Sequence, residues 1–95
     1  MTKEDILNYL KEHKVEFARK YGVEDIALFG SYARDEATKE SDIDIFVKME
    51  PKLFKLIGLK QEIEENLQKN IDIIREHNNI KPFFLKIIKK DMIYV

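Results

Sequence analysis

The sequence predicts an α/β (α+β) fold in which helices pack on one small β-sheet. Helical and strand-like segments alternate along the chain, in the order helix, strand, helix, strand, helix, strand, helix, with a short terminal strand after them. The connections between these segments are short, as is typical of one compact unit. No internal repeat, low-complexity stretch or linker interrupts the 95 residues. We therefore expect one domain over residues 1–95.

The first helix and the first strand are marked by a cap, an apolar stripe and a stop. Thr2 is suited to cap the helix, and Asp5 follows three residues later as in a capping box. The stripe comprises Ile6, Leu7, Leu10, Phe17, Ala18 and Tyr21. Gly22 is predicted to end the helix. Residues 23–29 are strand-like, and the continuous apolar run over 26–29 predicts a strand covered on both faces.

The middle of the chain reads as a short helix, a strand and a longer helix. A helix over 31–37 and a polar loop over 38–41 lead into a strand over 42–48, which Pro51 closes. A helix then runs to about residue 69, although Gly58 costs it about 1 kcal/mol relative to alanine. Apolar residues recur at helical spacing in this helix: Leu53, Leu56, Ile57, Ile63 and Leu67.

The last part of the chain is expected to add a strand, a helix and an edge strand. Residues 70–75 form the third strand, and Pro82 suits the first turn of the last helix. This helix is expected to turn four apolar side chains inward: Phe83, Phe84, Ile87 and Ile88. Residues 92–95 are predicted to form a short edge strand.

Composition and charge argue against several classes of protein. The formal net charge of −1 argues against extended nucleic-acid binding, which relies on many lysine and arginine contacts to phosphates. The absence of cysteine excludes a disulfide framework, a thiolate metal site and a cysteine nucleophile. The chain shows neither the apolar run of a signal peptide nor about 20 consecutive apolar residues to span a bilayer. We expect a cytoplasmic protein that does not bind membranes and that can bind a small anion.

The second strand carries two closely spaced carboxylates. Alternation along the strand places Asp42 and Asp44 on one face and the apolar residues between and after them on the other. Their Cα atoms are then about 6.5–7 Å apart, so both side chains can reach one divalent metal ion or bracket two. Without a cation, their repulsion would raise a carboxylate pKa. The alternative is that both lie at an exposed strand end.

A third carboxylate, Asp72, lies within the apolar third strand. Its desolvation there would be expensive without a partner. If the third strand lies beside the second, Asp72 joins Asp42 and Asp44, and the three predict a metal site. Taken alone, Asp72 could instead mark a strand edge or end.

A phosphate-binding turn is predicted where the first strand meets the short helix. Gly30 lets the backbone approach an anion closely, and N–H groups at a helix start point toward it. The Ser31 hydroxyl adds a donor, and Arg34 could reach the same phosphates with its guanidinium fork. Taken alone, Gly-Ser is an ordinary turn in most proteins, and Arg34 would more often be a surface charge.

Taken together, these motifs resemble the signature of a known enzyme family. Phe-Gly-Ser-Tyr-Ala-Arg at residues 29–34 is followed by Ser-Asp-Ile-Asp-Ile at residues 41–45. This combination resembles the polymerase-beta-like nucleotidyltransferases, and specifically their minimal nucleotidyltransferase family, over most of the chain. The resemblance implies a small mixed β-sheet with helices packed on it, as a single minimal nucleotidyltransferase domain over residues 1–95. Asp35 departs from the family, which often has glycine there, and adds a negative charge near the predicted phosphate site.

The resemblance also implies an activity and a partner. In the family, the acidic pair, here Asp42 and Asp44, holds two magnesium ions. The Gly-Ser turn, here Gly30 and Ser31, holds the triphosphate, and the third acid, here Asp72, helps to activate an acceptor hydroxyl. The reaction is transfer of a nucleoside monophosphate, AMP from ATP, with release of pyrophosphate. Similar proteins are commonly encoded beside a HEPN-domain toxin and serve as its antitoxin, some by adenylylating a tyrosine of the toxin.

Two other functions remain open from the sequence. A non-catalytic antitoxin would neutralise its partner by binding alone, and both Asp35 and the small size of the chain fit this alternative. Nucleotidylation of a small molecule such as an aminoglycoside is less favoured, because the larger relatives that perform it use an added domain.

The remaining polar residues are predicted to be ordinary surface groups. His13 in the first helix and His77 in the loop over 76–79 have no second metal ligand at a useful spacing. Four lysines near the exit of the second strand are expected to form a solvated face, since glutamates are interspersed: Lys48, Lys52, Lys55 and Lys60.

Overall fold

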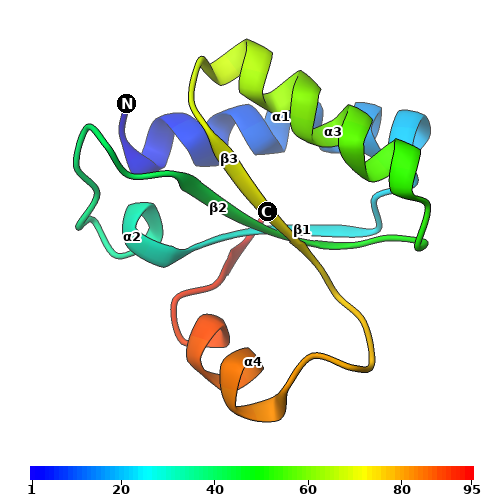
Figure 1. Ribbon diagram of the computed structural model, residues 1–95. Helices are drawn as coiled ribbons and strands as arrows, with labels where there is room; N and C mark the ends of the chain where they lie inside the picture. Colours follow the sequence, from blue (N-terminus) through cyan, green and yellow to red (C-terminus); the bar gives the residue numbers. More distant parts are fainter.

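All 95 residues are described by the computed structural model, which contains four helices and four strands (Figure 1). The helices are α1 (Lys3–Tyr21), α2 (Gly30–Ala33), α3 (Leu53–Leu67) and α4 (Pro82–Lys89). The strands are β1 (Asp25–Phe29), β2 (Ile43–Lys48), β3 (Ile71–Arg75) and β4 (Ile93–Tyr94). The predicted order of elements is confirmed, and so is the α/β class.

The four strands form one mixed sheet in the order β3-β2-β1-β4. Strands β1 and β2 run antiparallel, whereas β2 and β3 run parallel and are joined through α3, as a parallel connection requires. Strand β4 adds an antiparallel edge beside β1. The central strands β1 and β2 are therefore flanked by strands on both sides, and most of their residues are buried.

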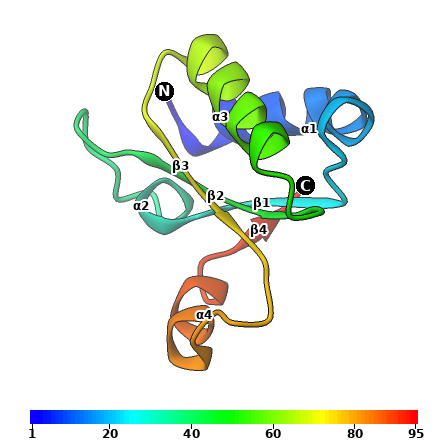
Figure 2. The same cartoon turned by 45° about the vertical axis from the view of Figure 1, so that its right-hand side comes forward.

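The two faces of this sheet are covered unequally. Helices α1 and α3 lie over one face, where a cluster of 16 buried residues forms the main core (Figure 1). Helix α4 alone lies on the other face, where Ile88 joins Ala27, Phe29 and Phe46 in a cluster of four (Figures 1 and 2). The second face is thus only partly covered by the chain.

Helix α1 begins and ends as the sequence predicted. The Asp5 backbone N–H donates to Thr2 Oγ1 at 3.2 Å, and the Thr2 N–H donates to Asp5 Oδ2 at 3.0 Å. This reciprocal pair satisfies donors that the helix itself leaves free. At the other end Gly22 has φ +72°, the left-handed conformation that follows many helices.

Gly58 permits close packing between α3 and α1. A Cβ at this position would lie 3.0 Å from Cε1 of Tyr21. The Tyr21 ring is held in place because its hydroxyl donates to Glu62 Oε1 at 2.7 Å, an oxygen that also accepts from Lys20 Nζ at 2.9 Å. The glycine that weakens α3 by propensity thus serves its contact with α1.

His13 is less accessible than the sequence predicted. It is half-buried in α1, with its ring centroid 4.3 Å from that of Tyr9 and 5.6 Å from that of Phe17. Its Nδ1 lies 2.9 Å from the Tyr9 carbonyl oxygen. Residues four apart on a helix share a face, which brings these rings together. His77 is exposed, as predicted.

Helix α4 contradicts the prediction that four of its apolar side chains turn inward. Only Ile88 is buried, whereas Phe83, Phe84 and Ile87 are 75%, 44% and 45% exposed. The helix has eight residues, of which only Lys86 and Lys89 are polar. Periodicity therefore could not indicate which side of the helix meets the sheet. Leu53 and Ile57 of α3 are exposed as well.

Helix α2 is shorter than the predicted helix over 31–37. Arg34 forms the C-cap, with φ −87° and ψ 0°, and Asp35 follows with φ +60°. A residue with left-handed backbone cannot continue a right-handed helix, so α2 ends at Ala33.

None of the four helices is both long enough and apolar enough to cross a membrane.

Candidate active site

The pairing of β2 with β3 brings two of the predicted carboxylates together. Asp44 and Asp72 are direct partners in the parallel register, so their Cα atoms lie about 4.8 Å apart and both side chains share one face. Asp42 immediately precedes β2, which begins at Ile43, one residue later than the predicted strand over 42–48. Alternation along the chain returns Asp42 to the face of Asp44. The sheet thus gathers the three acids at one end of its parallel strands.

These carboxylates lie on the sheet face that carries α4. Asp44 is opposite Phe29 in the antiparallel register and two residues before Phe46, and both phenylalanines belong to the cluster with Ile88. Asp44 is half-buried there, whereas Asp42 and Asp72 are exposed. One end of the site is therefore enclosed and the other is open to solvent.

The surroundings of Asp44 disfavour the ionised form of its carboxyl group. Burial raises its pKa above the ordinary range, and the negative charges of Asp72 and Asp42 raise the pKa further. The Arg34 guanidinium acts in the opposite direction. A bound cation would relieve this repulsion, as the sequence reasoning anticipated for the pair.

Gly30 leaves the space that the Asp44 carboxylate occupies. It has φ +76°, and a Cβ built on it would overlap Asp44 Oδ2 and lie 2.9 Å from Asp44 Cγ. Both the backbone conformation and the close approach thus require glycine. Ser31 follows in the first turn of α2 and is half-buried. The predicted turn therefore lies directly against Asp44.

Arg34 is held by two carboxylates. Its Nη1 lies 2.8 Å from Asp91 Oδ2, and its Nε lies 3.3 Å from Glu36 Oε1. The bond to Asp91, the largest cause, raises the pKa of the guanidinium. Sequence reasoning missed Asp91, which is 57 residues away along the chain. No local pattern could have indicated this pairing.

Asp35 contributes less negative charge to the site than expected. Lys3 Nζ lies 2.9 Å from Asp35 Oδ2, and this ion pair faces α1. The φ of +60° at Asp35 also shows why glycine suits this position, since only glycine adopts that conformation without steric cost.

The three carboxylates fit a magnesium site in their chemistry but do not converge on a single point. No group of three or more carboxylate, imidazole or thiol side chains lies close enough together to hold one metal ion. Magnesium usually takes one or two protein carboxylates and completes its shell with water and substrate phosphates. The neighbouring Asp44 and Asp72, with the Asp44 carboxylate lying against Gly30, agree with that mode of binding.

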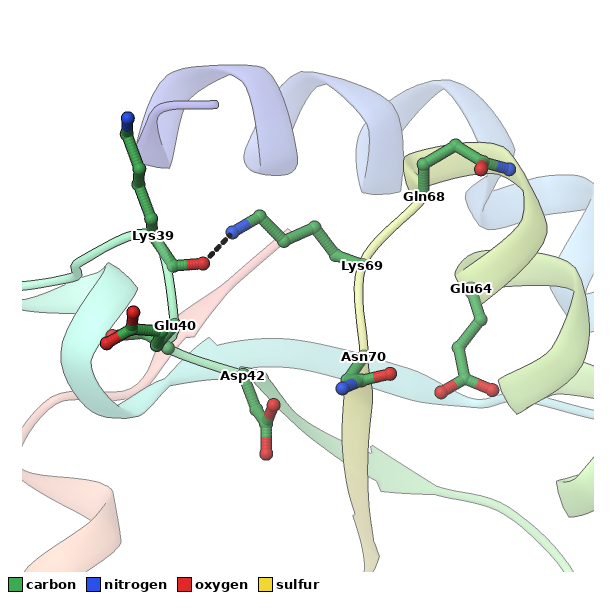
Figure 3. Close-up of a pocket in the computed structure, with 8 residues that line it drawn as sticks. Lys39, Glu40, Asp42, Glu64, Gln68, Lys69 and Asn70 are labelled. Atoms are coloured by element: carbon green, nitrogen blue, oxygen red, sulfur yellow. Dashed lines mark hydrogen bonds between the residues drawn. The ribbon is translucent and has the colours of Figure 1, made fainter.

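The largest cavity lies beside the acids rather than over them. It has a volume of about 740 Å³, and no hydrophobic residue lines it (Figure 3). Among the predicted site residues only Asp42 lines it, together with Glu64, Lys69 and Asn70 from the end of α3 and the turn into β3. Lys69 Nζ donates to the Lys39 carbonyl oxygen at 3.2 Å across it. Asn70 could have been found from sequence, because it directly precedes the third strand, as Asp42 precedes the second.

Comparison with known protein sequences gives consistent matches along the whole chain. Residues 10–95 match the family described as the nucleotidyltransferase domain. The chain is 42% identical over 96 residues to MJ0126 of Methanocaldococcus jannaschii, named as a candidate protein adenylyltransferase, covering 99% of this chain and 98% of that protein. It is 36% identical over 97 residues to the protein adenylyltransferase MntA of Thermococcus cleftensis, covering 100% and 97%.

Solved structures share the fold. One described as a candidate minimal nucleotidyltransferase superposes with a TM-score of 0.79 at 28% identity, covering 98% of this chain and 95% of that chain. A toxin–antitoxin structure with AMP-PNP gives a TM-score of 0.68 at 20% identity, covering 87% and 69%. At that lower identity the likeness speaks for the fold alone.

Proposed function

The chain belongs to the nucleotidyltransferase domain family, and within it to the minimal nucleotidyltransferases; on this premise we propose that it transfers AMP from ATP to a hydroxyl group of a protein. The nucleotidyltransferase activity is supported by the match of residues 10–95 to the nucleotidyltransferase domain family. Protein as the acceptor is supported by the names of relatives that align with nearly the whole chain. We propose that residues 1–95 act as one catalytic domain.

The register of Asp44 beside Asp72, with the Asp44 carboxylate lying against Gly30, is the observation that carries the proposed site. Asp42, Asp44 and Asp72 would hold two magnesium ions, which supply charge neutralisation for the triphosphate and the leaving pyrophosphate. The Ser31 hydroxyl and the backbone at Gly30 would bind the phosphates. Hydroxyl and N–H donors placed there orient the α-phosphate toward the acceptor.

Asp72 has the further role of receiving the proton of the acceptor hydroxyl. It is exposed at the open end of the site, where an incoming hydroxyl has access. A carboxylate within about 3 Å of that oxygen, directly or through water, can accept its proton as the bond to phosphorus forms. Asp44 is less suited to this role, because it is half-buried behind the Gly30 turn.

The acceptor in this proposal is a tyrosine of a HEPN-domain toxin, which the modification would neutralise in the cytoplasm. A relative that is 36% identical is named MntA, and a solved toxin–antitoxin assembly is described as MntA with HpeT. The shared name supports a toxin as partner. The protein would bind neither membranes nor extended nucleic acid, and its net charge of −1 agrees with this expectation.

Calorimetric titration with ATP, with and without magnesium, tests the site. The wild type should bind ATP in a magnesium-dependent manner, and the double variant Asp42→Asn, Asp44→Asn should lose that dependence. Incubation with ATP, magnesium and the HEPN-domain protein encoded beside the gene should then add one AMP per partner molecule, detected by mass spectrometry. Failure of the wild type to add AMP would count against the enzymatic proposal.

The contact-only antitoxin remains the second candidate because Arg34 is already paired. With Asp91 and Glu36 on its guanidinium, Arg34 has fewer donors free for phosphates than the sequence suggested. If the Asp42→Asn, Asp44→Asn variant still binds and silences the toxin, neutralisation occurs by contact. If this variant still binds the toxin but no longer silences it, neutralisation requires the transfer of AMP.

A further inference from the structure

Helix α4 presents to solvent an apolar stripe that the rest of the chain covers only in part. The stripe consists of Phe83, Phe84 and Ile87, all exposed, while the buried Ile88 anchors α4 to the sheet. Figure 2 shows α4 below the sheet with no second helix beside it. A contiguous apolar surface of this kind is typical of an interaction site.

The stripe is surrounded by unpaired positive charge. Lys81, Lys86, Lys89 and Lys90 are all exposed, and none of them forms a salt bridge. No acidic residue occurs between Glu76 and Asp91. This segment thus carries four positive charges, although the net charge of the whole chain is −1. The complementary surface is therefore apolar at its centre and acidic at its rim.

Helix α4 lies next to the proposed site. Ile88 packs with Phe29 and Phe46, the two residues that flank Asp44 across and along the sheet. At the end of α4, Asp91 binds Arg34 at 2.8 Å. A molecule seated on α4 is thus placed on the sheet face that carries the three carboxylates.

The charge arrangement favours a protein over a membrane or a nucleic acid. An extended polyanionic surface that reached the lysines of α4 would also approach Asp42, Asp44 and Asp72 and be repelled by them. A folded protein can place its acids opposite the lysines alone. The eight residues of α4 span only about 12 Å, which is short for a helix that lies in a bilayer interface.

We propose that the stripe of Phe83, Phe84 and Ile87, with its surrounding lysines, is the docking surface for the acceptor protein. Its occupant is an apolar helix face or shallow groove bordered by aspartate and glutamate. This inference rests on the proposed function, since it names the surface by which the acceptor reaches the same site. Docking energy gained at α4 would hold the acceptor hydroxyl near Asp72 and reduce the entropic part of the barrier.

Binding of the neighbouring HEPN-domain protein to designed variants tests this surface. The double variant Phe83→Ser, Ile87→Ser should raise the Kd at least tenfold by calorimetry, and Lys86→Glu, Lys90→Glu should weaken binding and reduce its salt dependence. Phe54→Ser is the matched control, because Phe54 is an 87% exposed phenylalanine on α3 with Lys52 and Lys55 beside it. The control should change the Kd by less than twofold. Magnesium-dependent ATP binding should be unchanged in all variants, which also shows that they fold.

The outcomes separate this inference from the proposed function. If the α4 variants bind the partner and receive AMP as the wild type does, the docking surface is wrong while the enzymatic proposal stands. If the α4 variants lose binding but even the wild type adds no AMP, docking stands and catalysis fails. An equal loss with Phe54→Ser, or no binding by the wild type, would overturn the docking proposal. The docking proposal would also be overturned if the wild type used α4 to bind phosphatidylserine vesicles in preference to the partner protein.

Discussion

At Gly30, the site depends on the absence of a Cβ atom. Its backbone is left-handed, and the space at its Cα is filled by the Asp44 carboxylate. Replacing Gly30 with alanine therefore combines two penalties: about 1–2 kcal/mol for left-handed backbone and about 1–3 kcal/mol for overlap. The carboxylate would have to move out of line with Asp72. We expect Gly30→Ala to lose most magnesium-dependent ATP binding, measured by calorimetry, and to be clearly destabilised in urea.

Gly22 supplies the control for that prediction. It has nearly the same backbone conformation, with φ +72° against +76° at Gly30, but no atom lies within 4 Å of a Cβ built on it. Gly22→Ala should therefore incur only the backbone penalty, about 1–2 kcal/mol, and leave ATP binding intact. Similar losses of ATP binding in the two variants would mean that backbone conformation, rather than the contact with Asp44, is what matters.

The raised pKa of Asp44 predicts a dependence of stability on pH. Burial, followed by the charges of Asp72 and Asp42, makes the ionised form costly in the folded state. This cost is absent below the ordinary aspartate pKa of about 3.9, grows between that value and the raised pKa, and is fully present above the raised pKa. In metal-free buffer, Asp44→Asn should therefore raise the thermal midpoint at pH 7 and change it little at pH 3. A lower thermal midpoint for Asp44→Asn than for the wild type at pH 7 would contradict a raised pKa at Asp44.

Magnesium should reverse the order of stability of these two proteins. Binding to the folded wild type at 100 times its Kd contributes about 2.7 kcal/mol, whereas a variant without the carboxylate pair gains little. Thermal unfolding with and without magnesium and ATP measures both effects. Equal shifts in wild type and Asp44→Asn would place the metal elsewhere.

At the scale of elements, the contact between α1 and α3 overrides helix propensity. Alanine at Gly58 would gain about 1 kcal/mol of propensity in α3. Its Cβ would press on a Tyr21 ring that cannot easily retreat, because the hydroxyl is bonded to Glu62. We expect Gly58→Ala to leave the free energy of unfolding unchanged or lower it. In a Tyr21→Ala background the same substitution should stabilise by about 1 kcal/mol, as measured by urea unfolding; destabilisation there would point to a different cause.

The elements were predicted well where local signals are strong. Thr2, Asp5 and Gly22 define α1 because capping depends on residues within one turn. The end of α2 was missed, since the left-handed conformation of Asp35 accompanies an ion pair to Lys3 from the start of the chain. The orientation of α4 was missed because its apolar residues surround the helix.

At the scale of the whole molecule, charge is segregated around the site. Carboxylates gather at one end of β2 and β3, lysines surround α4, and the Arg34–Asp91 pair joins the two regions. Asp91→Asn removes a negative charge near the phosphate site and frees Arg34. An exposed pair contributes at most about 1 kcal/mol, so we expect magnesium-ATP to bind about twofold to fivefold more tightly.

Calorimetry of three variants checks this expectation. Glu36→Gln removes the other carboxylate on Arg34 and should act in the same direction, whereas Glu16→Gln, on α1 and paired with Lys20, should have no effect. Weaker ATP binding in Asp91→Asn would show instead that Asp91 orients Arg34 toward the phosphates.

The sequence by itself determined the order of helices and strands, the caps of α1, the acidic pair and the Gly-Ser turn, since each depends on residues close together in the chain. The family resemblance rested on the same local motifs. Only the tertiary structure decided that Asp72 stands in register with Asp44, that Asp91 binds Arg34 and that Phe83 faces solvent. Those three facts depend on how the sheet pairs its strands and on which face each helix packs. Such contacts join residues far apart along the chain, and a local pattern carries no information about them.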